Sequence, residues 1–157
     1  MESILFVCLG NICRSPTAKA VFDHRLEAAG LRITTDSAGT TGYHQGRPPD
    51  PRAIHAAGEW GVDISSERAR IVTVEDFTRF DRIYAMDHAN LSDLRQRMPA
   101  DATAQLGLLM SLAPDYGVEE VPDPYYGGEE GFIRVIDMLV TAADGLIEEL
   151  GKMPGRS

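Results

Sequence analysis

The stretch ILFVCLGNICRSPTA, residues 4–18, joins a continuous apolar run to a polar turn and then to a helix start. A strand that reads as one apolar run, without alternation, is typical of a parallel sheet covered on both faces. Ser15 followed by Pro16 is a typical helix start, with serine as the N-cap and proline as the first helical residue. We therefore predict a buried strand over residues 4–7, then a turn, then a helix that ends at Gly30.

The same order of strand and helix continues along the chain. Further strands are expected over residues 31–37, 82–86 and 104–110, and further helices over 50–61, 73–80, 87–94 and 132–150. The apolar core of the last of these strands is compatible with a helix as well. Strands that alternate with helices run parallel, with helices on both faces of the sheet. We predict a doubly wound α/β fold with a four-stranded parallel sheet, forming a single domain over residues 1–157 with the last few residues frayed.

Charge and cysteine content disfavour several classes of function. Fifteen Lys and Arg residues against 24 Asp and Glu residues give a net charge of -9, so nucleic acid is not an expected partner. The N-terminus lacks the basic region of a signal peptide and no apolar segment is long enough to cross a bilayer. Two cysteines in a domain of this size are not a disulfide framework. We expect a cytoplasmic protein with reduced thiols and without membrane insertion.

Metal binding is not predicted. The four histidines show no metal-ligand spacing, and the two cysteines, which have four residues between them in CLGNIC, match no common zinc pattern. We therefore predict no metal and no cofactor.

The turn after the first strand has the composition of an anion site. In a doubly wound fold, ligands bind beyond the carboxyl ends of the strands, where this turn lies. Its backbone N–H groups at a helix start favour an anion of phosphate size, and Arg14 adds a planar guanidinium that can hold two oxygens. We expect these groups to lower the pKa of Cys8, whose thiolate is then placed for in-line attack. The other turn residues expected to contact the substrate are Leu9, Gly10, Asn11, Ile12, Cys13 and Ser15.

Cleavage of a phosphate ester also needs an acid that protonates the departing oxygen. Asp123, in VPDPYYGGEEG, follows the fourth predicted strand and therefore lies at the same edge of the sheet. Pro124 stiffens this loop, and Tyr125 and Tyr126 can line a slot for an aromatic leaving group such as tyrosine. Local sequence alone favours a structural Asp123, because Asp-Pro pairs are common in turns, and the two tyrosines are equally compatible with simple packing.

Three motifs together, CLGNICRSPTA, DSAGT and DPYYG, resemble those of the low-molecular-weight protein tyrosine phosphatases. The similarity runs the length of the chain and includes PPDPRA, RARI and MDHANL. It implies a phosphotyrosine-containing protein as the substrate and a phosphocysteine intermediate on Cys8. It also implies that Arg14 binds the phosphate and that Asp123 is first the general acid and then the base, with no metal involved.

The same resemblance implies roles around the turn. The supporting hydrogen-bond network is expected to consist of Asn11, Ser15 and Ser37, and the pocket wall of Tyr43, His44 and Tyr125. A tyrosine kinase that acts on Tyr125 or Tyr126 stays open as a second partner.

One position departs from the family pattern. Many relatives carry a histidine just before the R-A-R stretch, whereas this chain has Glu67. A carboxylate near the turn would raise the pKa of Cys8. We therefore expect Glu67 to point away from the turn or to be neutralised by Arg68 or Arg70.

Two other functions are compatible with an anion-binding turn. Thioredoxin-coupled arsenate reductases share the fold but need further cysteines, and none follows Cys13. A non-catalytic phosphoprotein-binding module would not need both the thiol and the acid. Cys13 is expected either to form a protective disulfide with Cys8 on oxidation or to be a small buried apolar residue.

Overall fold

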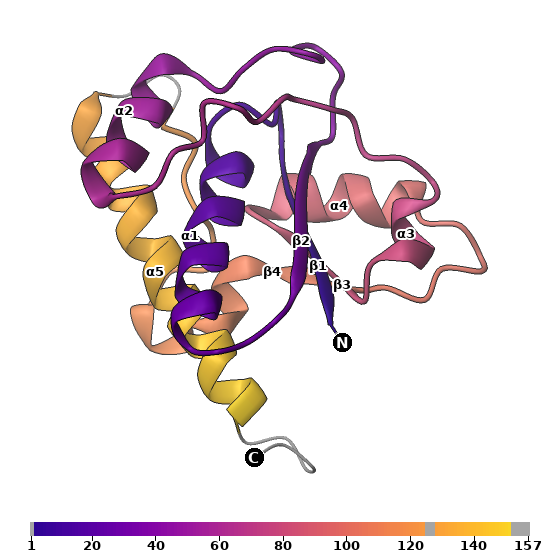
Figure 1. Cartoon of the computed structure of the whole chain (residues 1–157). Helices are drawn as coiled ribbons and strands as arrows, with labels where there is room; N and C mark the ends of the chain where they lie inside the picture. Colours follow the sequence, from indigo (N-terminus) through magenta and orange to yellow (C-terminus); the bar gives the residue numbers. More distant parts are fainter. Residues whose placement is uncertain (1, 125–127, 152–157) are drawn as a thin grey trace.

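Strands and helices alternate along the chain in a computed structural model that describes residues 2–124 and 128–151 (Figure 1). The strands are β1 (Ser3–Cys8), β2 (Thr34–Gly39), β3 (Arg82–Ala85) and β4 (Gln105–Leu108). The α-helices are α1 (Arg14–Ala28), α2 (Pro51–Trp60), α3 (Asp76–Arg79), α4 (His88–Arg97) and α5 (Glu129–Gly151). Two short 3-10 helices, η1 (Leu109–Leu112) and η2 (Pro114–Tyr116), follow β4. In the described part of the chain, no helix has the length and apolar character needed to span a bilayer.

The four strands form one sheet in the order β2-β1-β3-β4, and every neighbouring pair is parallel. β1 is central, with Phe6 in register with Ser37 of β2 on one side and Tyr84 of β3 on the other. The chain leaves β1 toward β2 and later crosses to the opposite side for β3, so the carboxyl end of β1 is the topological switch point. The predicted doubly wound α/β fold is confirmed.

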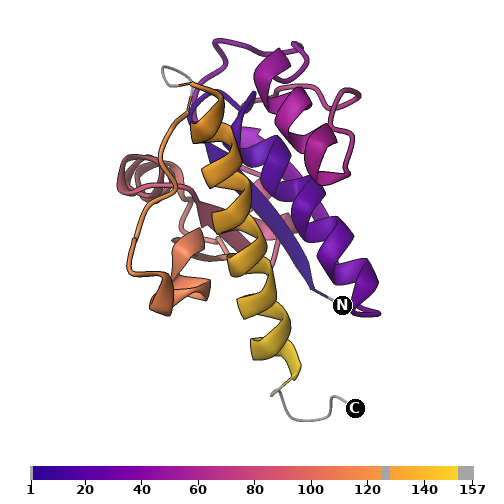
Figure 2. The same cartoon turned by 90° about the vertical axis from the view of Figure 1, so that its left-hand side faces the viewer.

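Helices cover both faces of the sheet, and successive side chains of β1 point to opposite faces. Ile4 and Phe6 are fully buried in a cluster with α1, α2 and α5, whereas Leu5 and Val7 are fully buried on the side of α3 and α4. Figure 2 shows α5 lying along α1. A strand buried on both faces is the reason for the continuous apolar run in the sequence.

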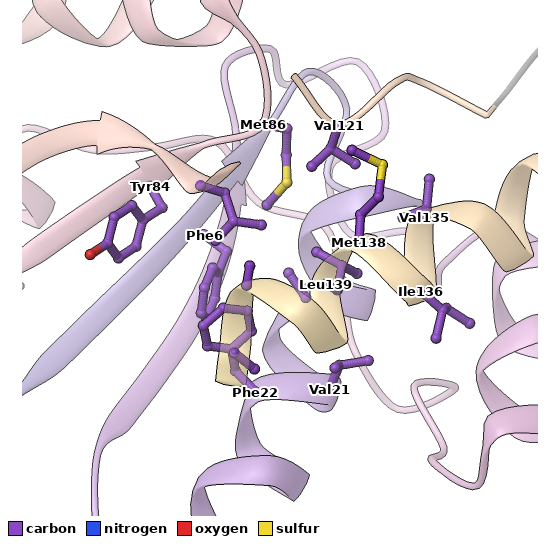
Figure 3. Close-up of a cluster of buried hydrophobic side chains, with 14 of the residues drawn as sticks. Phe6, Val21, Phe22, Tyr84, Met86, Val121, Val135, Ile136, Met138 and Leu139 are labelled. Atoms are coloured by element: carbon purple, nitrogen blue, oxygen red, sulfur yellow. The ribbon is translucent and has the colours of Figure 1, made fainter. Parts of the chain in front are cut away.

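The cluster under α1 and α5 supports the carboxyl end of β1 (Figure 3). The rings of Phe6 and Phe22 lie 4.7 Å apart between their centroids. Met86, Val121 and Met138 are buried in the same cluster, with Met86 and Val121 near the end of the strand. These contacts hold β1, β3 and the loop before α5 together at the edge where ligands are expected.

The start of α1 differs from the predicted one. The helix begins at Arg14 with Cys13 in the N-cap position, and Cys13 makes no side-chain cap hydrogen bond. The prediction that Ser15 is the N-cap is therefore wrong. The Ser15 hydroxyl is fully buried and lies 3.3 Å from the carbonyl oxygen of Ala38, so it bonds to the interior of the fold and leaves the helix end uncapped.

β2 begins, and β4 ends, inside its predicted range. β2 begins at Thr34, because the N–H of Leu31 still bonds to the carbonyl of Leu26 in the C-terminal cap of α1. β4 ends at Leu108, where the chain turns into η1 and the Ser111 hydroxyl donates to the Leu108 carbonyl at 2.6 Å. The apolar LGLLM stretch is therefore half strand and half 3-10 helix.

The predicted caps of two other helices are confirmed. Asp50 accepts the N–H of Arg52 at the start of α2, and Asp87 accepts the N–H of Asn90 at the start of α4, both at 2.8 Å. Gly61, with φ of 111°, ends α2 in the left-handed conformation that glycine adopts without strain.

Candidate active site

The turn between β1 and α1 is held in shape by backbone hydrogen bonds from other segments. The carbonyls of Cys8 and Leu9 accept the N–H groups of Thr40 and Thr41 at 2.9 and 3.1 Å. Asn11 has φ of 60°, a left-handed conformation that asparagine tolerates better than most residues. The turn is thus tied to the end of β2 and has a tight bend at its centre.

Gly10 packs closely against the side chain of His44. A Cβ added to Gly10 would lie 2.9 Å from Cδ2 of His44. Because real Cβ contacts are not that short, a larger residue would push His44 away from the turn. The position of His44 over the turn therefore depends on the absence of a side chain at Gly10.

Cys8 lies at the end of β1 and is 3% exposed. Its Sγ is 3.0 Å from the Ser15 hydroxyl oxygen, and the N–H of Asn11 donates to the same sulfur at 3.3 Å. The sulfur is therefore surrounded by hydrogen-bonding groups of the turn and of the first turn of α1.

The side chain of Asn11 joins the groups around Cys8 to β2. Its amide nitrogen donates to the hydroxyl oxygens of Ser15 at 2.7 Å and Ser37 at 2.9 Å. Its amide oxygen accepts the N–H of Arg70 at 2.9 Å. The structure thus brings together the three residues expected to form the supporting network. Asn11, which joins the other two, is 2% exposed.

Arg14 is buried, with 2% of the residue exposed, and its guanidinium is fixed from two sides. Nη1 donates to the Asp87 carboxylate at 2.8 Å and to the carbonyl of Val121 at 2.9 Å, and Nη2 lies 3.7 Å from the Asp123 carboxylate. Burial acts to lower the pKa of Arg14, but Cys8, Asp87 and Asp123 outweigh it and raise that pKa above its ordinary value. The guanidinium stays charged and cannot swing freely.

Asp87 and Val121 are contacts of Arg14 that the sequence reading missed. The sequence marks Asp87 as the cap of α4, a signal that places it at the carboxyl end of β3 but does not indicate its second bond to Arg14. The carbonyl of Val121 has no side-chain signature, and 107 residues separate it from Arg14.

A cavity of about 390 Å³ opens over the turn. It is lined by Cys8, Leu9, Gly10, Ile12, Cys13, Arg14, Thr41, Tyr43, His44 and Asp123. All of these except Thr41 were expected at the site, whereas Asn11, Ser15 and Ser37 support its floor from behind. Tyr125 and Tyr126 lie outside the described residues. The volume is in the range of small-ligand sites, and the floor is polar.

The rim of this cavity carries exposed apolar side chains. Tyr43 is 85% exposed and its ring lies 4.8 Å from that of His44, edge to face. Leu9 is 49% exposed on the turn itself. Aromatic and aliphatic surface therefore flanks the entrance, beside the cationic and thiol groups of the floor.

Cys13 has a different environment from Cys8. It is 5% exposed and also borders a small apolar hollow formed with Ala53, Ala56 and Phe132. Burial, with the negative charge of Asp50, strongly raises the pKa of Cys13. Both cysteines are free thiols in the structure.

Glu67 is half-buried and lies near other charged groups. Burial raises the pKa of its carboxyl, Lys19 acts to lower it, and Asp36 and Asp23 act to raise it. The expected neutralisation by arginine is not seen. Arg70 pairs with Asp36 and Asp76, and the Arg68 guanidinium donates to the carbonyls of Ser65 and Glu67.

Metal ligands are not gathered at this site. Within residues 2–124 and 128–151, no group of three or more His, Cys, Asp or Glu side chains is arranged to hold a metal ion.

Comparison with known proteins identifies close relatives. Residues 3–154 match the family described as low molecular weight phosphotyrosine protein phosphatase. A low molecular weight protein-tyrosine-phosphatase of Streptomyces coelicolor is 43% identical over 151 residues, which cover 92% of this chain and 90% of the relative.

Solved structures agree with this match over nearly the whole chain. A crystal structure of a protein tyrosine phosphatase from Entamoeba histolytica, with Hepes in the active site, has a TM-score of 0.91 at 41% identity and covers 98% of this chain and 100% of its own. A crystal structure of a Drosophila arginine phosphatase has a TM-score of 0.90 at 29% identity and covers 98% of this chain. The match covers 99% of the chain of that arginine phosphatase.

Proposed function

This chain belongs to the low-molecular-weight phosphotyrosine protein phosphatase family, and we propose from this premise that its cavity hydrolyses phosphotyrosine monoesters through a phosphocysteine intermediate. The observation that carries the proposal is the meeting of three groups in one cavity. A thiol with two hydrogen-bonding neighbours, a fixed guanidinium and a carboxyl group line the same space, as Cys8, Arg14 and Asp123. Nucleophile, anion binder and acid are the parts that this chemistry needs.

In the first step the Cys8 thiolate attacks the phosphorus atom. The S–P bond forms as the bond from phosphorus to the tyrosyl oxygen breaks, and the Asp123 carboxyl group gives its proton to that oxygen. Arg14 binds two of the phosphoryl oxygens and stabilises the charge that spreads over them. Its bonds to Asp87 and Val121 keep the guanidinium in position, so little ordering is needed at the moment of reaction.

In the second step a water molecule attacks the phosphocysteine. The Asp123 carboxylate accepts a proton from the water, the S–P bond breaks, and inorganic phosphate leaves. The departing sulfur regains its negative charge, which the Asn11 N–H and the Ser15 hydroxyl stabilise by hydrogen bonds. The same two donors therefore serve the nucleophile in one step and the leaving group in the next.

Proteins that carry phosphotyrosine are the proposed partners. The exposed side chains of Leu9 and Tyr43 offer apolar contacts beside the entrance, which suits an aromatic phosphoamino acid.

A kinase that phosphorylates Tyr125 or Tyr126 stays a prediction. The cytoplasm also stays the predicted location, since a reducing compartment preserves free thiols. The single-domain assignment over residues 1–157, with a frayed end, is likewise a prediction.

A redox role is proposed for Cys13. Hydrogen peroxide converts the Cys8 thiolate to a sulfenic acid with release of hydroxide, and the Cys13 thiol then displaces water and closes a disulfide. Because the pKa of Cys13 is raised, this closure should quicken as the pH rises. Mass spectrometry after mild peroxide treatment checks it: an internal disulfide supports the role, and a sulfinic acid on Cys8 contradicts it.

Substrate class is tested with matched peptides that carry phosphotyrosine, phosphoserine or phosphoarginine. The last is included because a Drosophila arginine phosphatase shares the fold. We expect turnover of the phosphotyrosine peptide and little of the phosphoserine peptide, whose short side chain cannot bring its phosphate to the cavity floor past the rim. Faster turnover of phosphoarginine would contradict the proposed substrate.

The same assay separates catalysis from binding. A Cys8→Ser variant that binds the phosphotyrosine peptide but does not turn it over supports the enzyme. Turnover unchanged in that variant would contradict the assignment of Cys8 as the nucleophile.

A further inference from the structure

Arg70 lies outside the cavity but makes ion pairs with two elements of the fold. Its Nε and Nη2 donate to the Asp36 carboxylate of β2 at 3.3 and 3.0 Å. Its Nη1 and Nη2 donate to the two carboxylate oxygens of Asp76 at the start of α3, at 2.9 and 3.1 Å. One guanidinium therefore bridges β2 and α3, a geometry that the planar five-donor group allows and a lysine ammonium does not reproduce.

The backbone of Arg70 is bonded to the groups behind Cys8. Its N–H donates to the amide oxygen of Asn11 at 2.9 Å, and its carbonyl accepts the N–H of Gly39 at 2.8 Å. Asp36 reaches the same place by a second route, because it accepts the N–H of Ser37, whose hydroxyl oxygen in turn accepts from Asn11. The ion pairs of Arg70 and the supporting network thus share residues.

The contact from the Arg70 backbone decides which way the Asn11 amide faces. A backbone N–H can only donate, so the group opposite it must be the amide oxygen of Asn11. The amide nitrogen then has to face Ser15 and Ser37 and donate to both. Since the Ser15 oxygen accepts this bond, its own hydrogen has two acceptors within reach, the Ala38 carbonyl at 3.3 Å and the Cys8 sulfur at 3.0 Å, and the sulfur is the nearer one. A thiolate only accepts, so this direction is the one it needs.

We propose that Arg70 is a positioning residue for the reaction: its ion pairs with Asp36 and Asp76 hold its backbone against Asn11 and so set the direction of the hydrogen bonds that end at Cys8. The inference rests on the proposed role of Cys8 as the nucleophile.

The ion pair of Arg70 with Asp76 is better shielded from water than the one with Asp36, whose side chain is 35% exposed. Asp76 is 2% exposed, and burial acts to raise its pKa. Hydrogen bonds from the Arg70 side chain and the Thr73 N–H outweigh that effect and keep the pKa of Asp76 below its ordinary value of 3.8. The pair is therefore charged across the neutral range, and removing Arg70 would leave a buried carboxylate unpaired.

The test compares Arg70→Met with a matched control, Arg82→Met. Arg82 is 14% exposed and also bridges two carboxylates, those of Glu2 at 2.9 Å and Glu149 at 2.6 Å. It lies at the amino end of β3, away from the cavity. For each variant, the pH dependence of Cys8 inactivation by iodoacetate is measured, together with kcat/KM for p-nitrophenyl phosphate and the urea midpoint of unfolding.

We expect both variants to unfold at lower urea concentration, but only Arg70→Met to change the chemistry. Its kcat/KM should fall about tenfold, and the pH at which iodoacetate inactivation reaches half its maximal rate should move upward. Arg70→Lys, which keeps the charge but not the two-sided bridge, should fall between the wild type and Arg70→Met.

If Arg70→Met does not fold, Asp36→Asn decides instead, because it removes one partner of Arg70 and leaves the buried pair with Asp76. A wild-type inactivation profile and wild-type kcat/KM in the folded Arg70 or Asp36 variants would overturn the proposal. Failure of the proposed function gives a different result from failure of this proposal. Cys8→Ser would then keep its turnover, while the iodoacetate profiles of the Arg70 variants would still report how Cys8 is positioned.

Discussion

The two cysteines of the turn have almost the same exposure but opposite surroundings. Cys8 is 3% exposed and Cys13 is 5% exposed. The Cys8 sulfur meets the Asn11 N–H and the Ser15 hydroxyl, whereas Cys13 borders apolar side chains and its pKa is raised by burial. The two thiols are therefore buried to nearly the same degree, and the groups around each sulfur are what differs.

The helix start does not account for the difference either. Cys13 occupies the N-cap position of α1 itself, and Cys8 lies six residues before the first residue of the helix. The observed difference lies in the contacts that the Cys8 sulfur makes with the Asn11 N–H and the Ser15 hydroxyl, and the following experiments probe the effect of that difference.

The largest effect is expected when each cysteine is replaced in turn. Cys8→Ser should lower kcat for p-nitrophenyl phosphate by about 10⁴-fold or more, as expected when a covalent nucleophile is lost. Cys13→Ser should lower it by less than about tenfold, because this sulfur makes no bond in the reaction. Equal losses in the two variants would erase the distinction between them.

Replacement of the acid should have the next largest effect. Asp123→Asn keeps the size of the side chain but cannot give a proton, so kcat for a phosphotyrosine peptide should fall about 10²- to 10³-fold. The loss should be smaller for p-nitrophenyl phosphate, whose leaving group departs without protonation. If both substrates lose the same factor, Asp123 has another role.

A smaller effect is expected at Ser15. Ser15→Ala removes the hydroxyl that contacts the Cys8 sulfur. The Ala38 carbonyl, the other partner of this hydroxyl, can only accept and cannot take its place, so kcat/KM should fall about tenfold. Thr17→Ala is the matched control, since its hydroxyl bonds to the Cys13 carbonyl at 2.7 Å and not to Cys8. Similar losses in both would point to a general disturbance of α1.

The smallest effect concerns stability in alkaline solution. The folded-state pKa of Cys13 is raised above the ordinary value of 9.0, so the folded chain keeps a proton that the unfolded chain loses above that pH. Stability from this thiol is complete below pH 9.0 and declines as the pH rises, by at most about 1.4 kcal/mol per pH unit. Cys13→Ala should show a shallower decline in urea unfolding free energy above pH 9.0, and equal slopes would contradict it.

Most of the fold and part of the site can be predicted from the sequence because the relevant residues are neighbours. β1, the turn and α1 follow one another, so apolar run, turn composition and helix start are read together. The prediction that Ser15 caps the helix is wrong because it also rests on neighbouring residues alone. Local preference favours the cap, but the buried hydroxyl finds partners in Ala38 and Cys8 that lie far away along the chain.

What the sequence could not predict depends on long-range contact. The bonds of Arg14 to Asp87 and Val121 span 73 and 107 residues. The bond from Arg70 to Asn11 spans 59 residues and uses a backbone N–H, which leaves no trace in residue type. Such contacts are set by the parallel pairing of β1 with β3 beside the switch point and by the loops around it.

The most direct test of the central claim is to trap the covalent intermediate. The enzyme is mixed with a phosphotyrosine peptide, quenched in acid within the first turnover, digested and analysed by mass spectrometry. A phosphoryl group on Cys8, absent from Cys13 and lost as the delay before quenching grows, is the predicted result. Turnover with no phosphoryl group on Cys8 at any delay, or with the group on Cys13, would contradict the assignment of these two thiols.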